Sequence, residues 1–169
     1  MTTVAFDGRW LASDSQLNDG QRRVHEPRRP KFYARKCFVV AWSGAVSWHE
    51  QLADWLASPR KLRGDYPIEP ELDSEAMVYT GGQWRRYTNS AHGFELVRGK
   101  WAIGSGSDYA LAGMLLGHDA VEAVWVGAQL DLCTSAPIFA IDMQAYNGKT
   151  LGVVKEYGEE RPKAEKGRW

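Results

Sequence analysis

The first residues of the chain place a hydroxyl side chain where it can carry out chemistry. Thr2 follows Met1, and cells commonly remove a first methionine when a small residue comes next. Thr2 would then carry a hydroxyl and a free α-amine on one residue. Such an amine has a reference pKa of roughly 7.7–8.0, so near neutral pH it can accept the hydroxyl proton. This predicts Thr2 as both nucleophile and base; the alternative is an ordinary edge-strand threonine.

A β-hairpin is predicted to hold Thr2 in position. Short apolar runs lie on both sides of Asp7-Gly8, a dipeptide that tolerates the positive φ angles of a tight turn. Chain termini generally fray unless something ties them down, and strand pairing would fix residue 2 with little slack.

A second candidate group is the backbone at Gly44. The apolar run 38–45 ends in small residues, and from Val46 the apolar positions recur at helical spacing until Ser58-Pro59 stops the helix. Backbone N–H groups at a strand-to-helix turn point outward, and glycine lets a substrate approach, so Gly44 is a candidate oxyanion donor. The alternative is a plain connection.

Two further groups of polar residues lie at predicted element ends. Gly104-Ser105-Gly106 follows a strand and lacks the Lys-Ser/Thr ending of a phosphate-binding P-loop, so a nucleotide site is not expected. A helix is predicted from Asp119, which forms a capping-box-like start with Glu122, and its last turn holds Asp131 and Thr134. An exposed aspartate at a helix end is also common without any function.

These residues together resemble the proteasome β-type peptidases, particularly the bacterial form HslV, over roughly residues 2–154. The start Thr2-Thr3-Val4, the Gly-Ser-Gly turn and the Asp-x-x-Thr helix end carry the resemblance, with Thr134 in place of the family's serine. The resemblance implies that Lys31, held by Asp14, lowers the pKa of the Thr2 amine, with Arg28, Arg29 and Lys36 as nearby competitors of Lys31. It implies these catalytic residues: Thr2, Asp14, Lys31, Gly44, Ser105, Asp131 and Thr134. Trp42 and Val46 would line the substrate pocket. The large Trp42 ring would either narrow this pocket or form an aromatic floor for it.

The resemblance also implies a fold and an activity. The fold is the α+β, four-layer αββα sandwich of N-terminal-nucleophile hydrolases, and the order of predicted elements suits two packed antiparallel sheets with helices outside. Residues 59–73 are polar where the family has a second long helix, so that helix is expected to be shortened. The activity is peptide-bond hydrolysis through an acyl-enzyme on Thr2, with no metal or organic cofactor. Expected partners are a peptide or unfolded protein, a homo-oligomeric ring and an ATPase unfoldase.

The remaining elements are predicted as hairpins, short helices and a tail. Hairpins are expected at 75–80 with 83–88, at 94–97 with 100–103, and at 137–146 with 151–155 around Asn147-Gly148; a short helix is expected at 110–116. One domain, 1–154, is followed by a charged, flexible tail, 155–169. The tryptophan-rich helix face that includes Trp48 and Trp55 is predicted to be an oligomer contact.

Composition excludes several functions. Lys plus Arg equals Asp plus Glu at 21 each in 169 residues, so the whole molecule has no general attraction for nucleic acid or an anionic membrane. The charge-rich segment 21–36 has only Phe32 and Tyr33 as stacking aromatics, which favours a solvated connection over a nucleic-acid site. Cys37 and Cys133 are expected to be reduced and buried.

The sequence has no apolar run near the roughly 18 residues that a membrane-spanning helix needs, and no signal peptide, so neither a membrane nor secretion is expected. A cytoplasmic location is expected. Two other functions stay open: a proteasome-like assembly protein that retains Met1 and does not cleave, and an amidase that acts on a small amide.

Overall fold

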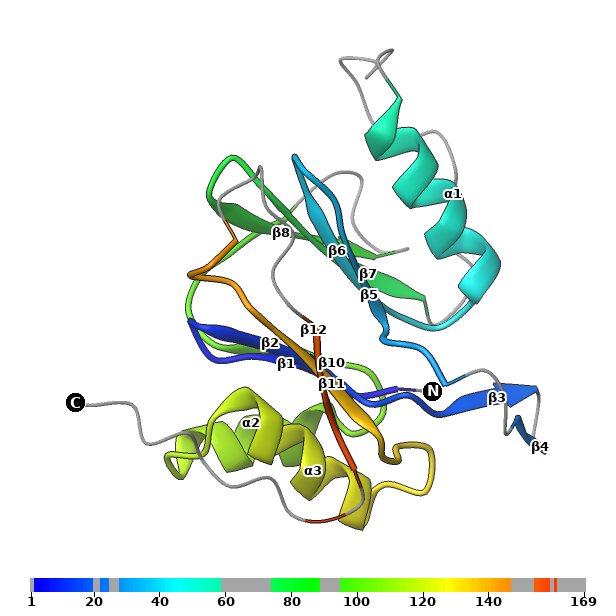
Figure 1. The fold of residues 1–169 in the computed structure, drawn as a ribbon, viewed down its shortest axis with the longest axis vertical. Coiled ribbons are helices and arrows are strands. Elements are labelled where there is room, and N and C mark those ends of the chain that lie inside the picture. Colours follow the sequence, from blue (N-terminus) through cyan, green and yellow to red (C-terminus); the bar gives the residue numbers. More distant parts are fainter. Residues whose placement is uncertain are drawn as a thin grey trace.

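Two five-stranded antiparallel sheets form the middle of the molecule, and helices cover their outer faces (Figure 1). The structure, a computed structural model, describes residues 2–19, 22–24, 28–58, 74–88, 95–146, 154–158 and 160. The four layers run from α1 (Val46–Ala57) through the two sheets to α2 (Ser107–Leu115) and α3 (Ala120–Leu130). This is the predicted αββα sandwich.

The first sheet contains the N-terminal hairpin. Its strand order is β10 (Trp101–Ile103), β1 (Val4–Phe6), β2 (Trp10–Ser13), β11 (Ile138–Asp142) and β12 (Val154–Tyr157). The hairpin predicted at Asp7-Gly8 is confirmed: β1 and β2 pair with Val4 opposite Ser13, and Gly8 has a φ of 110°. The Asp7 carboxylate closes the turn by accepting hydrogen bonds from the N–H groups of Arg9 and Trp10. The chain therefore enters the sheet at Val4, directly after Thr2 and Thr3.

The second sheet has the strand order β5 (Phe32–Ala34), β6 (Val39–Ser43), β7 (Glu75–Thr80), β8 (Gln83–Thr88) and β9 (Glu95–Val97). The Gly81-Gly82 hairpin predicted from the sequence is confirmed with both strands at the expected bounds. Both glycines have positive φ angles, 59° and 81°, which other residues rarely adopt. Turn chemistry alone was sufficient to place this pair.

Alternating side chains build three cores. Val4 and Phe6 point into the core between the sheets, whereas Ala5 packs under α2 and α3. In the same way Val39 and Ala41 face the other sheet, while Val40 and Trp42 face α1. Since successive strand residues point to opposite faces, a strand covered on both sides is apolar throughout. This explains why these strands form continuous apolar runs.

The helices begin and end close to the predicted positions. The cap expected at Asp119 is confirmed, because its carboxylate accepts a hydrogen bond of 2.9 Å from the N–H of Glu122 at the start of α3. The first helix runs over Val46–Ala57 as expected, whereas α2 starts at Ser107 instead of residue 110. None of the helices in the described ranges is long and apolar enough to cross a membrane.

The hairpin predicted at 94–103 is wrong. The strand β9 pairs with β8 in the second sheet, and β10 pairs with β1 in the first, so the chain crosses between the sheets at residues 98–100. Trp101 fills the space between the sheets, with its ring 4.8 Å from that of Trp84 and 5.8 Å from that of Phe6. A local turn signal does not indicate which sheet the next strand joins.

A two-stranded hairpin lies where a solvated connection was expected. The strands β3 (Leu17–Asp19) and β4 (Arg22–Val24) pair with each other and with neither large sheet. The segment is rich in charge, so its sequence lacks the apolar alternation that identifies a half-buried strand. Backbone pairing alone defines it.

The last strand extends beyond the predicted domain boundary. Residues 154–157 pair with 138–141, so the first three residues of the expected tail belong to the first sheet. Residues 161–169 lie outside the described ranges, as do the segment 59–73 and the predicted Asn147-Gly148 turn.

The prediction of buried cysteines is wrong for Cys37, which is exposed, and Cys133 is half-buried. Cys37 lies in the turn between β5 and β6, where the N–H of Arg35 donates to the carbonyl of Phe38, so its side chain is outside the core.

Candidate active site

Thr2 and Thr3 directly precede Val4, the first paired residue of β1, and are buried. The N–H of Gly106 donates to the Thr2 carbonyl at 3.4 Å, and the N–H of Asp14 donates to the Thr3 carbonyl at 3.0 Å. Gly106 therefore holds the backbone of Thr2, and Asp14 holds that of Thr3. The side chain of Thr2 has a fixed direction.

That side chain meets Lys31, which directly precedes β5. The Lys31 Nζ lies 2.6 Å from Thr2 Oγ1 and 3.1 Å from Asp14 Oδ1, and it also donates to the Gln16 carbonyl. Lys31 is only 3 % exposed and Asp14 is fully buried. The three N–H donors of an ammonium group match these three acceptors. The structure thus brings Thr2, Asp14 and Lys31 together, as the sequence resemblance implied.

Asp14 holds its place through the backbone as well as through Lys31. Its carboxylate accepts hydrogen bonds from the N–H groups of Thr3 at 2.9 Å, Gln16 at 2.9 Å and Ser135 at 3.4 Å. Burial raises the pKa of the Asp14 carboxyl, and Lys31 and the N–H groups of Thr3 and Gln16 oppose that rise. Burial likewise lowers the pKa of Lys31, while Asp14 acts in the opposite direction. The pair costs desolvation energy that its mutual hydrogen bonds offset only in part.

The turn Gly104-Ser105-Gly106 packs directly on the threonines. A Cβ at Gly104 would overlap the Thr2 carbonyl oxygen, and one at Gly106 would overlap the Thr3 hydroxyl. The φ of Gly104 is also 93°, a region that favours glycine. Both glycines are therefore required by close approach, and Ser105 between them is placed next to the backbone of Thr2.

Ser105 belongs to a chain of hydrogen bonds around Asp131. The carboxylate of Asp131 accepts from Ser105 Oγ at 2.6 Å and from Thr134 Oγ1 at 2.5 Å, and Thr134 Oγ1 lies 2.6 Å from Thr3 Oγ1. Because Thr134 uses its one proton on the carboxylate, Thr3 must be the donor to Thr134. The partial burial of Asp131 would raise its pKa, but the hydroxyl donors outweigh that effect and hold it below its usual range.

Asp131 and Thr134 lie just beyond α3 and not in its last turn. The helix ends at Leu130, and Asp131 has the extended backbone of a C-cap with a ψ of 121°. Leu132, which follows Asp131, is 95 % exposed. The periodic pattern overestimated the helix by about one turn, which is the usual uncertainty for helix ends.

Gly44 lies between β6 and α1 with a φ of 101°. Its neighbour Ser43 approaches the Gly104 turn, since a Cβ built at Gly104 would be 3.0 Å from Ser43 Oγ. The predicted oxyanion donor thus lies in the turn that faces the loop beside Thr2.

A pocket of about 310 Å³ adjoins Lys31, between α1 and the edge of the second sheet. Trp42 and Val46, the two predicted pocket residues, both line it. Trp42 is almost fully buried and forms part of the wall, so its large ring does not close the pocket. The complete lining consists of Leu17, Arg29, Pro30, Lys31, Phe32, Tyr33, Trp42, Val46 and Glu50.

Sequence reasoning missed several residues that support the site. Gln16 acts through its backbone carbonyl, which leaves no signal in residue type. Glu75, at the start of β7, accepts a hydrogen bond of 3.2 Å from the N–H of Gly104 while its other oxygen binds Arg86. Thr3 was considered only as part of the N-terminal pattern. In the described ranges, no group of three or more His, Cys, Asp or Glu residues could hold a metal ion.

Comparison with solved structures places this geometry in a known fold. The chain superimposes on Thiobacillus denitrificans BPH in complex with epoxomicin with a TM-score of 0.60 and 18 % identity, covering 94 % of this chain and 100 % of that one. It superimposes on the Anbu (Gly-1) mutant from Hyphomicrobium sp. strain MC1 with a TM-score of 0.67 and 10 % identity, covering 94 % and 88 %.

Anbu, described as an ancestral beta-subunit, from Yersinia bercovieri gives a TM-score of 0.64 and 11 % identity, with 95 % of this chain and 88 % of that chain covered. At such low identity these likenesses establish a proteasome-like fold and no more. No protein-family model matches the sequence, and no curated protein matches it.

Proposed function

We propose that the chain is a threonine peptidase in which Thr2, freed by removal of Met1, attacks the carbonyl of a peptide bond. The observation that carries the proposal is the 2.6 Å hydrogen bond between Lys31 Nζ and Thr2 Oγ1 in a buried site next to an open pocket. A threonine that served only to pair a strand would need no buried ammonium group at its hydroxyl, because burying a charge is costly.

We propose different roles for the two amines. Lys31 meets Asp14, the Gln16 carbonyl and Thr2 Oγ1, which suits a protonated lysine that donates to the hydroxyl oxygen. The proton of the Thr2 hydroxyl then goes to the α-amine of the same residue. The positive charge of Lys31 lowers the pKa of that amine by like-charge repulsion and keeps it able to accept a proton.

The reaction then has two halves. Thr2 Oγ1 forms a bond to the carbonyl carbon, the α-amine takes the hydroxyl proton and passes it to the departing amine, and the peptide C–N bond breaks. Water next attacks the resulting ester, gives one proton back to Oγ1 through the same amine, and releases the acid. The N–H of Gly44 is proposed to donate to the oxyanion in both halves.

Ser105 and Asp131 are proposed to orient the amine. Ser105 has one proton, and the 2.6 Å bond to Asp131 uses it. Ser105 Oγ lies 3.4 Å from the Thr2 carbonyl. Its lone pairs are then available to accept a hydrogen bond from the α-amine of Thr2. Thr134 contributes through Asp131.

We also propose a homo-oligomer, with an HslV-like ATPase unfoldase as a partner on the strength of the sequence resemblance alone. The contact predicted through Trp48 is wrong, because Trp48 is 1 % exposed and packs between α1 and the second sheet. Two separate pairs of exposed leucines are proposed as contacts in its place: Leu115 and Leu116 at the end of α2, and Leu130 and Leu132 at the end of α3. A monomer in light scattering at micromolar concentration would contradict this part.

Intact mass and N-terminal sequencing test the central proposal, together with three variants of Thr2. The purified protein is expected to begin at Thr2 and to gain the mass of an electrophilic probe for N-terminal threonine; epoxomicin, bound by the BPH protein of the same fold, is a suitable first choice. Thr2→Ala and Thr2→Val should fold but neither react nor cleave, whereas Thr2→Ser should keep some rate.

Hydrolysis by protein that retains Met1 would refute the mechanism. Retained Met1 without hydrolysis would favour a non-catalytic assembly protein. Cleavage of small acyl-amides but not of peptides would favour the amidase.

A further inference from the structure

The pocket beside Lys31 has a wall of stacked rings. Tyr33 and Trp42 lie 4.5 Å apart between ring centroids with their planes 32° from parallel, and the ring of His49 lies 5.2 Å from that of Trp42. His49 in turn contacts Trp48 edge-on at 4.9 Å. Since Trp42 has ring neighbours from both β5 and α1, it is held in place before any ligand arrives. The wall is therefore rigid and aromatic.

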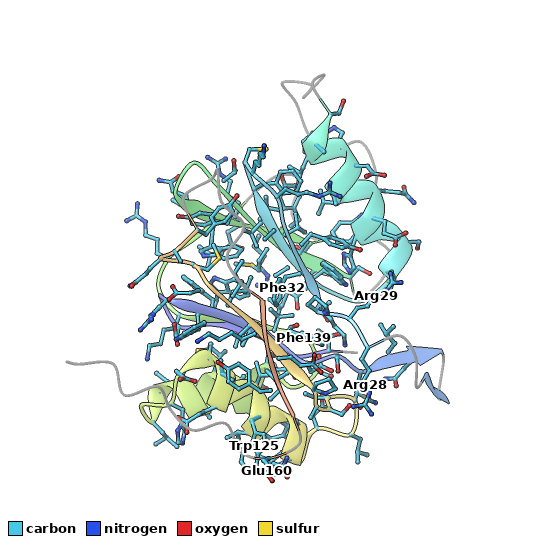
Figure 2. All side chains as sticks on the ribbon, viewed as in Figure 1. Arg28, Arg29, Phe32, Trp125, Phe139 and Glu160 are labelled. Carbon is cyan, nitrogen blue, oxygen red and sulfur yellow. The ribbon has the colours of Figure 1, made fainter. Side chains whose placement is uncertain are left out.

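Opposite charges lie at the rim of this wall. Arg29 and Glu50 both line the pocket and are exposed, and Figure 2 shows Arg29 beside the first turn of α1. Burial raises the pKa of the Tyr33 hydroxyl; the carboxylates of Glu50 and Asp54 act in the same direction, and the guanidinium groups of Arg29 and Arg35 act against it. Two acidic and two basic groups thus act on the Tyr33 hydroxyl, and one of each sign, Glu50 and Arg29, lines the pocket.

This balance disfavours a charged guest. A charged side chain that enters the pocket loses its hydration, which costs free energy. One of the two rim charges attracts it and the other repels it, so the net electrostatic interaction does not offset that cost. A neutral ring loses little hydration and gains ring contacts, which are worth about 0.5–1.5 kcal/mol beyond the area that they bury. The volume of about 310 Å³ is at the lower end of ordinary ligand pockets and accommodates a single side chain.

We infer that this pocket selects substrates with a neutral aromatic residue, phenylalanine, tyrosine or tryptophan, on the acyl side of the scissile bond, and that Arg29 and Glu50 act as a pair that excludes charged side chains. The inference rests on the proposed function, because a bound side chain belongs to a substrate only if the chain is a peptidase. The preference of the pocket itself can be measured without any reaction.

Binding of the N-acetyl amides of phenylalanine, leucine, arginine and glutamate to the full chain, followed by ligand-observed NMR, tests the preference. The phenylalanine amide should bind at least about twofold more tightly than the leucine amide, the lower bound of the ring-contact energy. The two charged amides should bind at least about fivefold more weakly than the phenylalanine amide. Equal binding of all four, tighter binding of a charged amide, or no saturable binding of the phenylalanine amide would overturn the inference.

Matched variants test the rim. Arg29→Gln leaves Glu50 unopposed and should improve binding of the arginine amide, whereas Glu50→Gln should improve binding of the glutamate amide. Trp42→Leu should remove the advantage of phenylalanine over leucine, with a circular dichroism melt to confirm folding. If both rim variants changed the two charged amides alike, the charge filter would be refuted.

A pair of electrophilic probes separates this inference from the proposed function. One probe carries phenylalanine and the other glycine at the residue that enters the pocket. Faster labelling of Thr2 by the phenylalanine probe supports both ideas, and equal labelling refutes the inference alone. Absence of labelling with an intact preference among the amides refutes the proposed function alone.

Discussion

The two helical layers cover their sheets with side chains of different sizes. Under α2 and α3 the core is rich in alanine: Ala5, Ala12, Ala110, Ala120, Ala123 and Ala140. Under α1 it is rich in large rings: Phe38, Trp42, Trp48 and Tyr87. Small residues let backbones approach, and a Cβ at Gly113 of α2 would lie only 3.3 Å from the Cα of Ala123 in α3. One layer is tightly closed, and the other leaves a pocket at its edge.

This difference matches the division of labour that we propose. The closed layer contributes the elements that fix the nucleophile, because the Gly104-Ser105-Gly106 turn leads into α2 and Asp131 ends α3. The aromatic layer contributes Trp42 and Val46 to the pocket. Lys31 contacts the Thr2 hydroxyl and also lines the pocket. Four perturbations, in order of decreasing effect, test whether the two layers act in this way.

Removal of Lys31 should have the largest effect. Lys31→Ala leaves the buried carboxylate of Asp14 without its partner, so the free energy of unfolding should fall by about 3–5 kcal/mol. Turnover should fall by at least about tenfold, as expected for a positioned acid–base partner. Lys31→Arg should also be slow, because guanidinium does not fit a compact site. Denaturant unfolding and peptide hydrolysis measure the two quantities.

The double variant Lys31→Met with Asp14→Asn separates the two effects. It removes both charges, so stability should recover relative to Lys31→Ala while activity stays low. The partly exposed pair of Arg9 and Asp142, which the site does not use, is the control, and Arg9→Ala should cost about 1 kcal/mol or less. Near-normal turnover of Lys31→Ala would remove Lys31 from the mechanism.

Gly106→Ala should disturb the closed layer specifically. The added Cβ would overlap the Thr3 hydroxyl and lie 3.1 Å from Thr134 Oγ1 and 3.3 Å from Asp131 Oδ2. Overpacking of this kind costs about 1–3 kcal/mol, and it would displace the strand that carries Thr2. Thermal unfolding and labelling of Thr2 measure the effect. Gly158→Ala is the matched control, since nothing lies within 4 Å of a Cβ there; equal effects of the two variants would contradict the proposed packing.

His49 should make the aromatic layer sensitive to acid. It is fully buried, and its ring lies against those of Trp42 and Trp48. Burial lowers its pKa from 6.5 to about 3. The unfolded chain therefore binds a proton below pH 6.5 that the folded chain refuses, so stability is full above that pH and falls as the pH drops towards 3.

At pH 5 the loss should be about 2 kcal/mol relative to pH 7.5, measured by urea unfolding. His49→Leu removes the proton uptake and the buried polar atoms, so its stability should vary less between these two pH values than that of the wild type. An identical pH dependence in both proteins would show that His49 is not the cause.

Thr3→Val should give the smallest effect. It keeps the branched shape and removes the hydroxyl that donates to Thr134, which should cost about 1 kcal/mol of stability. The hydrogen bond from the Thr134 hydroxyl to the Asp131 carboxylate should then weaken, so the pKa of Asp131 should rise. The acid limb of the pH profile of kcat/KM should therefore move to higher pH. Thr3→Ser keeps the hydroxyl and should have the acid limb of the wild type. If the acid limb of Thr3→Val were unchanged, Thr3 would have only a structural role.

Much of the local structure could be predicted because it depends on neighbouring residues. Asp7-Gly8 and Gly81-Gly82 specify tight turns through their backbone freedom, and Asp119 caps α3 through an N–H three residues away. The strand β10 could not be assigned to its sheet in this way. Its partner β1 is separated from it by about half of the chain, and only the packing of Trp101 between the sheets settles the choice.

The candidate site divides along the same line. The sequence by itself determined the types and order of the site residues and the resemblance that joins them. The tertiary structure decided that Lys31 reaches Thr2 across 29 positions and Ser105 across 103, that Thr134 meets Thr3, and that Trp42 leaves a pocket open. Side-chain contacts over such separations depend on how two sheets pack, since the backbone between them carries no signal of the final distance.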